Sequence, residues 1–239
     1  MNGFLKSGYV LVLFAIFGII VSAGGAVAAV ATPQLGWQYT SGNGAVYGLG
    51  ISAEGDSLIA LIGFGFAPGG QIVSLDPATG AARWLVETEE APSADPVVVD
   101  GVVYAGIGSL VGGGAAVYAL DAGTGDVLWR TDVERSDLPA TPIDAVTLAS
   151  GTLFVNRGDA TLLALDAATG MIEWEIELQK PTRGAPAVSG DRVFVASGFD
   201  GAIILAFDID TGEALWSVED PANPVTGPVL SGGLLYIPF

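Results

Sequence analysis

The sequence of 239 residues contains neither cysteine nor histidine. The first absence excludes disulfides, thiolate nucleophiles and the lipid attachment of a lipoprotein, all of which need a cysteine. The second excludes metal sites built on imidazole and any nucleophile that relies on a histidine base. Catalytic mechanisms that depend on either side chain are therefore excluded before any motif is considered.

Positive charge is scarce, because eight Lys and Arg residues stand against 26 Asp and Glu residues. The net charge of −18 argues against nucleic acid as a partner, since affinity for a phosphate backbone needs clustered Lys and Arg. Only Lys6 and Lys180 are lysines. An acidic surface poor in lysine either keeps a halophilic protein hydrated at high salt or serves solubility in general.

Helical patterning is also lacking, whereas the chain has 35 Gly, 13 Pro and 51% apolar residues. This composition predicts many short strands joined by tight turns around a sizeable core. One motif then organises the chain, because four stretches keep an Asp, a Thr-Gly pair and a Trp at the same internal offsets. They are Asp76–Trp84, Asp121–Trp129, Asp166–Trp174 and Asp208–Trp216. Their Asp residues are 45, 45 and 42 residues apart, which indicates an array of stacked repeats.

Each repeat predicts four short strands. In the second repeat, residues 96–105 predict a hairpin with Asp100-Gly101 as its turn, and residues 117–129 predict a second hairpin across the Asp–Thr-Gly turn. Turns equivalent to the first are expected near Gly55-Asp56, Ser150-Gly151, Gly190-Asp191 and Gly232-Gly233. Four-stranded units of this length that stack face to face predict an all-β fold, a β-propeller similar in layout to WD40 propellers. A β-sandwich would not repeat its turn chemistry at this period, and a helical solenoid needs an apolar stripe that is absent.

The repeated residues have structural explanations. We expect each Asp to accept backbone N–H groups within its own turn, each Gly to adopt a left-handed conformation, and each Trp to dock one blade on the next. These blade-docking positions are Asp76, Gly80, Trp84, Asp121, Gly125, Trp129, Asp166, Gly170, Trp174, Asp208, Gly212 and Trp216. We assign no catalytic, cofactor-binding or metal-binding residue.

At these motifs the chain resembles the PQQ-like (pyrroloquinoline-quinone-type) β-propeller repeat family, whose mark is Ala-x-Asp-x-x-x-Gly-x-x-x-Trp. Ala119, Asp121, Gly125 and Trp129 match it, and the first copy differs in having Ser74 at the Ala position. The resemblance covers about residues 35–239 and implies seven- or eight-bladed rings, of which this chain holds four complete repeats plus partial ones.

The ends of the repeat array lead to two further expectations. The sequence stops at Phe239, where a fifth motif hairpin would begin, so we expect either a C-terminal truncation or a second copy that completes the ring by self-association. The leading fragment Leu35–Trp37 is a candidate for a strand that closes the ring against the last unit.

Enzymes of the family bind the quinone and a calcium ion in the central channel, with an Asp base and an adjacent Cys pair. This chain has no cysteine, so the resemblance carries no catalytic residue over. We therefore expect a protein that is not an enzyme and has no cofactor. The alternative is a fragment of an alcohol or sugar dehydrogenase that uses PQQ with calcium.

Several acidic and Gly-rich stretches permit a second interpretation. Asp121 with Asp126 offers oxygen ligands for calcium, but turn capping already explains Asp121. The acidic run Glu87–Glu90 is interpreted as a solvated loop. The Gly-rich stretch Gly106–Gly114 precedes a strand, whereas a phosphate-cradling loop must open a helix, so it is interpreted as a connection between strands. The equivalent loop Gly63–Gly70 carries Phe64 and Phe66, candidates for partner contacts or for simple packing.

The N-terminus predicts export. Lys6 precedes an uncharged run over residues 9–31 that ends in two small-x-small sites, Ala26-Val-Ala and Ala29-Val-Ala, as in a secretory signal peptide. A run of this length can also anchor the chain in a membrane. We expect residues 1–31 to be a signal peptide or anchor, and residues 32–239 to form a partial propeller outside the cytoplasm. This protein is expected to be secreted, periplasmic or held at the outer face of the membrane, as a scaffold that binds proteins of the cell envelope.

Overall fold

The computed structural model describes residues 10–14, 35–40, 45–51, 56–63, 69–108, 114–133, 142–182, 184–198 and 200–239. Over these ranges the chain is all-β. Of the N-terminal segment 1–31 only Val10–Phe14 is described, as strand β1, and the rest of that expectation lies outside the described residues. No helix in the described ranges is long and apolar enough to cross a bilayer.

Four antiparallel sheets of four strands follow one another along the chain, and each is a meander of strands adjacent in sequence. The first sheet contains β3 (Ala45–Ile51), β4 (Leu58–Gly63), β5 (Gly70–Leu75) and β6 (Ala82–Thr88). The second contains β7 (Val97–Val99), β8 (Val102–Gly108), β9 (Ala115–Asp121) and β10 (Val127–Asp132). The third contains β11 (Ile143–Ala149), β12 (Thr152–Arg157), β13 (Thr161–Asp166) and β14 (Ile172–Glu177). The fourth contains β15 (Ala187–Ser189), β16 (Arg192–Ser197), β17 (Ala202–Asp208) and β18 (Ala214–Asp220).

Two partial sheets of two strands flank these four. One pairs β1 with β2 (Leu35–Thr40), and the other pairs β19 (Val229–Ser231) with β20 (Leu234–Tyr236). The predicted all-β fold of four-stranded antiparallel sheets is therefore confirmed for the described part of the chain.

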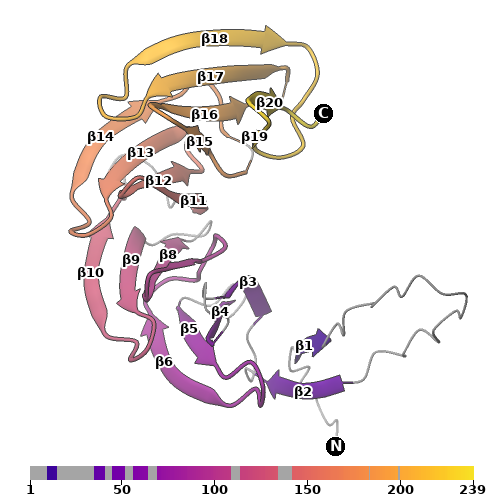
Figure 1. The fold of residues 1–239 in the computed structure, drawn as a ribbon, viewed down its shortest axis with the longest axis vertical. Coiled ribbons are helices and arrows are strands. Elements are labelled where there is room, and N and C mark those ends of the chain that lie inside the picture. The colour runs from indigo at the N-terminus through magenta and orange to yellow at the C-terminus, as the bar shows by residue number, and fades with distance from the viewer. Residues whose placement is uncertain are drawn as a thin grey trace, which may run out of the picture.

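The sheets stand side by side along an open arc in chain order (Figure 1). Strands β6, β10, β14 and β18 lie on the outer side of the arc, and the first strands of the sheets lie on its inner side. The middle strands are buried because neighbouring sheets cover both of their faces, as the burial of nearly every residue of β9 and β13 shows. Outer strands such as β10 and β14 instead alternate between exposed and half-buried residues.

The core lies between the sheets. Tyr104 and Val117 of the second sheet belong to one buried cluster with Val155 and Leu163 of the third sheet, and equivalent clusters join the first sheet to the second and the third to the fourth. Side chains from β-branched and other aliphatic residues fill these layers, as expected for strands that are buried on both faces. Each sheet thus gains its burial from its neighbours, as in other repeat arrays.

The short turns between the first two strands of the second and third sheets agree with the sequence prediction, whereas Gly55 of the turn expected in the first sheet lies outside the described residues. In the fourth sheet Gly190 has a φ of 60°, and Asp191 does not have a positive φ. Asp100 and Gly101 have φ of 50° and 75°, and Ser150 and Gly151 have φ of 53° and 83°. Positive φ at both central positions is typical of type I′ turns, whose twist matches that of the flanking strands.

A feature that the sequence did not predict is a bulge at the same place in each of the four four-stranded sheets. In the second sheet Val127 pairs with Leu120 and Trp129 pairs with Ala119, so Leu128 has no partner across the strands. The other three sheets show the same register shift beside Trp84, Trp174 and Trp216. A bulge turns the following side chain and increases the local twist. Each Trp pairs with a small residue on the third strand of its sheet, which is Ser74 in the first sheet and Ala in the other three.

Candidate functional site

The Asp of each motif is used by its own turn. Asp121 Oδ1 accepts hydrogen bonds from the backbone N–H groups of Gly123 and Thr124 at 2.9 and 2.8 Å, and the N–H of Gly125 donates to the Asp121 carbonyl oxygen at 2.8 Å. Gly125 has a φ of +80°, where a side chain is costly. Hydrogen bonds to the ionised form, first that from Thr124 N–H, lower the pKa of Asp121.

The other three turns repeat this geometry with small differences. Asp76 also accepts a bond from the Arg83 guanidinium at 2.9 Å, and this contact, followed by those from Thr79, lowers its pKa to about 2. The hydroxyl of Thr169 donates to Asp166 at 2.5 Å and lowers the pKa of that carboxyl. The Asp carboxylates are thus ionised, and they accept hydrogen bonds from groups of their own turns.

Each motif turn also contacts a Trp of the preceding sheet. Trp129 Nε1 donates to the carbonyl oxygen of Ala167, the residue after Asp166, at 3.0 Å. Equivalent bonds join Trp84 to Ala122 O at 2.9 Å and Trp174 to Ile209 O at 3.0 Å.

The Gly of the turn makes room for that indole. A Cβ atom placed on Gly170 would lie 2.5 Å from the Trp129 ring, and Cβ atoms on Gly125 and Gly212 would meet Trp84 and Trp174 in the same way. These glycines therefore meet two requirements, a left-handed backbone and a flat surface for the indole. An aromatic residue two strands away in the same sheet completes the contact, since the ring centroids of Tyr104 on β8 and Trp129 on β10 are 6.0 Å apart.

Two further Trp residues lie outside this set of three. Trp37 donates to Pro77 O at 2.8 Å and its ring lies against Gly80. It thus makes the same contact with a motif turn, here called a joint, on the first sheet. Its strand β2 pairs with β1 and not with the last unit, so the expected ring closure is not seen. Trp216 occupies the motif position of the fourth sheet, but within the described residues it has no turn above it and is 40% exposed.

Sequence reasoning did not identify Arg157, which is only 1% exposed. Its guanidinium pairs with Asp159 and Glu175 at 3.0 Å each and also donates to the Val133 carbonyl oxygen and to Thr161 Oγ1. Val133 follows the second sheet, so Arg157 joins the second and third sheets at the end of β12. Buried arginine is tolerated only when its donors are satisfied. A lone arginine in a sequence does not reveal such partners.

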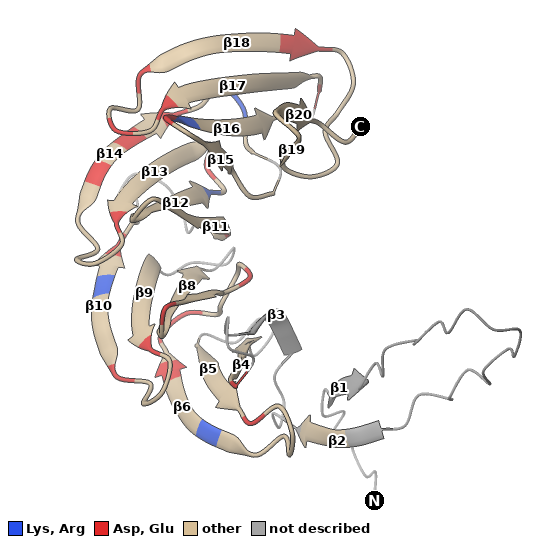
Figure 2. Ribbon diagram, in the orientation of Figure 1, with Lys and Arg blue, Asp and Glu red and all other residues tan. Residues whose placement is uncertain are grey.

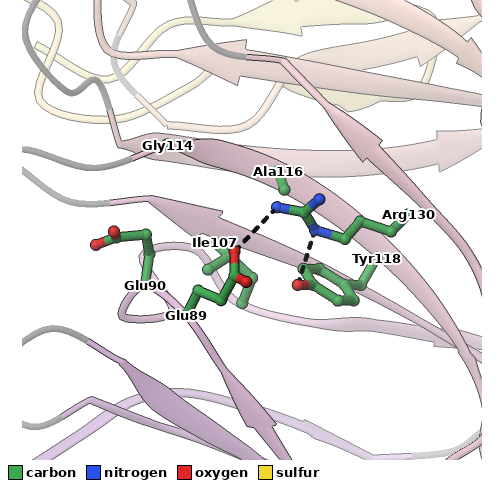
Figure 3. Close-up of a pocket in the computed structure, with 7 residues that line it drawn as sticks. All are labelled: Glu89, Glu90, Ile107, Gly114, Ala116, Tyr118 and Arg130. Carbon is green, nitrogen blue, oxygen red and sulfur yellow. Dashed lines mark hydrogen bonds and ion pairs between the residues drawn. The ribbon is translucent and has the colours of Figure 1, made fainter.

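A pocket lies between the first and second sheets (Figure 3). Arg130 Nε donates to Tyr118 Oη at 2.9 Å, and its Nη2 atom lies 3.5 Å from Glu89 and 2.8 Å from Asp132. Glu90 points away from Arg130, and burial followed by the charge of Glu89 raises its pKa. The interpretation of the acidic run as a loop was wrong for Glu87 and Thr88, which end strand β6. Glu89 is 85% exposed, as a solvated position requires, and it lines the pocket together with Glu90.

The size of this pocket decides what it can hold. Its volume is about 40 Å³, whereas sites for organic cofactors occupy roughly 300–1,000 Å³. No group of three or more Asp and Glu side chains in the described residues is arranged to hold a metal ion. These residues do not fit a quinone with calcium. Phe64 and Phe66, and residues 109–113 of the Gly-rich stretch, lie outside the described residues.

The sequence matches a family model twice, over residues 23–141 and 113–239, and the model is described as outer membrane protein assembly factor BamB. None of the curated proteins matches this sequence significantly.

Solved structures share the fold. BamB from Moraxella catarrhalis is 21% identical with a TM-score of 0.55, and the alignment covers 85% of this chain and 70% of that one. The computationally designed Ika8 protein is 18% identical with a TM-score of 0.67 over 85% of this chain and 58% of its own. Quinohemoprotein alcohol dehydrogenase from Comamonas testosteroni is 17% identical with a TM-score of 0.58 over 77% of this chain and 38% of its own.

These similarities agree with the repeated contact between the Trp of one sheet and the motif turn of the next. Identities this low establish the fold alone, while the two family matches together span most of the sequence. The chain therefore belongs to the family of PQQ-type β-propeller repeats that is described as outer membrane protein assembly factor BamB.

Proposed function

We propose that this protein is a non-catalytic β-propeller that acts outside the cytoplasm as a protein-binding scaffold of the cell envelope. The observation that carries the proposal is the family match, because the matching model is described as an assembly factor. The geometry of the motifs supports it. Their Asp, Gly and Trp residues are used for turns and contacts between sheets, so binding falls to the residues that differ between repeats.

The described surface suits protein contacts more than catalysis. Apolar side chains such as Leu128, 54% exposed, and Met171, 69% exposed, stand among acidic residues on the outer side of the arc. Figure 2 shows Asp and Glu along the outer strands and at the turns, with few Lys and Arg. A mixed apolar and charged surface without a deep pocket is typical of protein interfaces.

Photo-crosslinking in the native cell tests the scaffold role. A photoreactive amino acid at Phe64 or Phe66 should yield discrete crosslinked products with envelope proteins, whereas the same group at Ala168, an exposed residue of a motif turn, serves as the control. Equal products from all three positions, or none from the loop, would contradict a binding role for that loop. The N-terminal sequence of the purified protein distinguishes a start near residue 32 from a retained anchor over residues 9–31.

The dehydrogenase alternative rests on the shared fold of the quinohemoprotein enzyme. It is tested by titrating the protein with PQQ in the presence of calcium. Because the pocket at Arg130 is too small for the quinone, we expect no change in quinone absorbance and no thermal shift. A saturable shift that requires calcium would favour the dehydrogenase over the scaffold.

A further inference from the structure

A space between the second and third sheets is filled by an arginine side chain, whereas the equivalent space between the first and second sheets is open. In the filled space Arg157, only 1% exposed, donates to the carbonyl oxygen of Val133. Its guanidinium also pairs with Asp159 and Glu175. The open space is the pocket at Arg130, with a volume of about 40 Å³. Because the sheets are repeats, the two spaces can be compared residue by residue.

Strand pairing defines which residues of the two sheets are equivalent. In the third sheet Arg157 pairs with Thr161. In the second sheet Ile107 pairs with Ala116. Thr161 and Ala116 each lie 13 residues before the Trp of their motif, so the two pairs occupy equivalent places. Ile107 of the second sheet therefore has the position of Arg157 in the third sheet.

The residues at these equivalent positions leave the pocket open. Ile107, Ala116 and Gly114 line it, where the third sheet has Arg, Thr and Asp. On the opposite wall, Thr88 of the first sheet has the position of Val133, since each lies four residues after its motif Trp. A cavity needs roughly 10–15 Å³ to hold one water, so the pocket has room for about three waters or for one planar guanidinium group.

The charges around the pocket favour a cation. Arg130 supplies one positive charge, but its Nη2 atom lies 2.8 Å from Asp132 and 3.5 Å from Glu89. Glu90 lines the pocket and points away from Arg130 (Figure 3). Its carboxylate makes no hydrogen bond or ion pair with the residues that the structure describes. Negative charge therefore remains uncompensated at Glu90, and the net charge of −18 adds to the attraction for a cation.

Among cations, a guanidinium group fits this pocket best. Glu89 and Arg130 are 85% and 38% exposed, so the pocket opens to solvent. In the described ranges no three acidic side chains are grouped to hold a metal ion. A guanidinium group has five N–H donors in a planar fork, which can meet carboxylates and a backbone carbonyl group together, as Arg157 does. An ammonium group is a point charge without this fork.

We propose that the pocket at Arg130 is a binding site for a guanidinium group, which packs against Ile107 and Ala116 and donates to the carboxylate of Glu90. Two sources share this chemistry, a free guanidinium compound and the arginine side chain of a protein segment. The site follows from the comparison of two interfaces within the chain and goes beyond the proposed scaffold function. Either of the two can therefore fail without the other.

Titration of the full chain, followed through backbone amide NMR shifts, tests the site and identifies the source. The free probe is methylguanidinium and the peptide probe is acetyl-Gly-Arg-Gly-amide, with methylammonium and the corresponding Lys peptide as matched controls. Both guanidinium probes should give saturable shifts at Glu90 and Gly114, and should bind at least about fivefold more tightly than their ammonium controls. Equal binding of the Arg and Lys probes would overturn the assignment.

The two guanidinium probes also distinguish the sources. If the Arg peptide binds at least about tenfold more tightly than methylguanidinium, contacts beyond the head group contribute, and the site takes a side chain of a protein segment. If the two bind equally, the site takes a free guanidinium compound.

Matched variants separate the pocket from general attraction of cations. Glu90→Gln removes the charge at nearly constant size and should weaken methylguanidinium binding at least about fivefold. Glu87→Gln is the control, because Glu87 is an exposed residue of β6 that does not line the pocket. Equal weakening by the two variants, or unchanged binding in Glu90→Gln, would overturn the site.

A third variant fills the pocket from within the chain. Ile107→Arg places a guanidinium group where Arg157 places one in the next interface, so it should abolish binding of both guanidinium probes. Circular dichroism checks that each variant is folded, and the two Gln variants decide the question without this buried substitution. Full binding to a folded Ile107→Arg variant would contradict the proposed position of the ligand.

Discussion

Replacing Trp129 by alanine should cost about 3–5 kcal/mol of unfolding free energy. A Trp buries roughly 150–250 Å², which at about 25 cal/mol per Å² is worth about 4–6 kcal/mol when burial is complete. Trp129 is partly buried, so less than this is lost, but its hydrogen bond to Ala167 O contributes about 1 kcal/mol. The indole also fills the space above Gly170, which would become a cavity between the second and third sheets.

The fourth sheet provides the matched control. Trp216→Ala removes the same side chain from the same strand position, but it is 40% exposed and has no covering turn in the described residues. We expect this variant to lose only about 1–2 kcal/mol, because less area is uncovered and no cavity forms between sheets.

Urea unfolding followed by far-ultraviolet circular dichroism measures both losses without relying on the fluorescence that the substitutions remove. Hydrogen exchange then locates the effect, since a broken joint should release amides in β10 and in the turn 166–170 before those of the fourth sheet. A loss below about 1 kcal/mol for Trp129→Ala, or one no larger than that of Trp216→Ala, would refute the role of this Trp in holding sheets together.

Four further outcomes are expected. Gly170→Ala should cost about 2–4 kcal/mol, because its Cβ would strike the Trp129 ring, whereas Gly151→Ala, with φ of +83° but open space, should cost only about 1 kcal/mol. Similar losses would mean that the ring yields freely. The carboxyl of Asp76 has its pKa lowered from 3.8 to about 2, so its contribution to stability is present above pH 4 and lost as the pH falls towards 2. Asp76→Asn should therefore flatten acid unfolding in this interval, and an unchanged profile would contradict the assignment. Arg157→Met should cost about 3–5 kcal/mol by leaving Asp159 buried and unpaired, with part regained in the double variant Arg157→Met/Asp159→Leu, as measured by urea unfolding. Because the net charge is −18, raising NaCl from about 0.1 to 1 M should screen repulsion and raise the melting temperature, whereas a fall would argue against charge repulsion as a cost.

The local features of the fold could be read from the sequence. Asp100-Gly101 and Ser150-Gly151 predicted tight turns, and both adopt the positive φ values that such turns require. The Asp and Gly of each motif predicted a compact hairpin, because a carboxylate three residues before a backbone N–H can cap its own turn. These features depend on residues close together in the chain.

Several features that depend on distant residues were not predicted. Arg157 meets Val133 and Glu175 only after two sheets have packed together. Likewise, Trp37 contacts Gly80, which lies 43 residues later in the chain. The short fragment that contains Trp37 does not by itself predict this contact. The bulge at Leu128 was not predicted because pairing register is set between strands and not within one strand.

The sequence by itself determined the repeated unit, its turns, its all-β character and the absence of thiol and imidazole chemistry. These properties follow from residue types and from spacing within about ten residues, where the backbone has few choices. The tertiary structure alone decided which Trp residues are covered. Trp129 and Trp216 occupy the same place in the motif, yet the first lies beneath a neighbouring turn and the second is exposed, because burial depends on the presence of the next sheet.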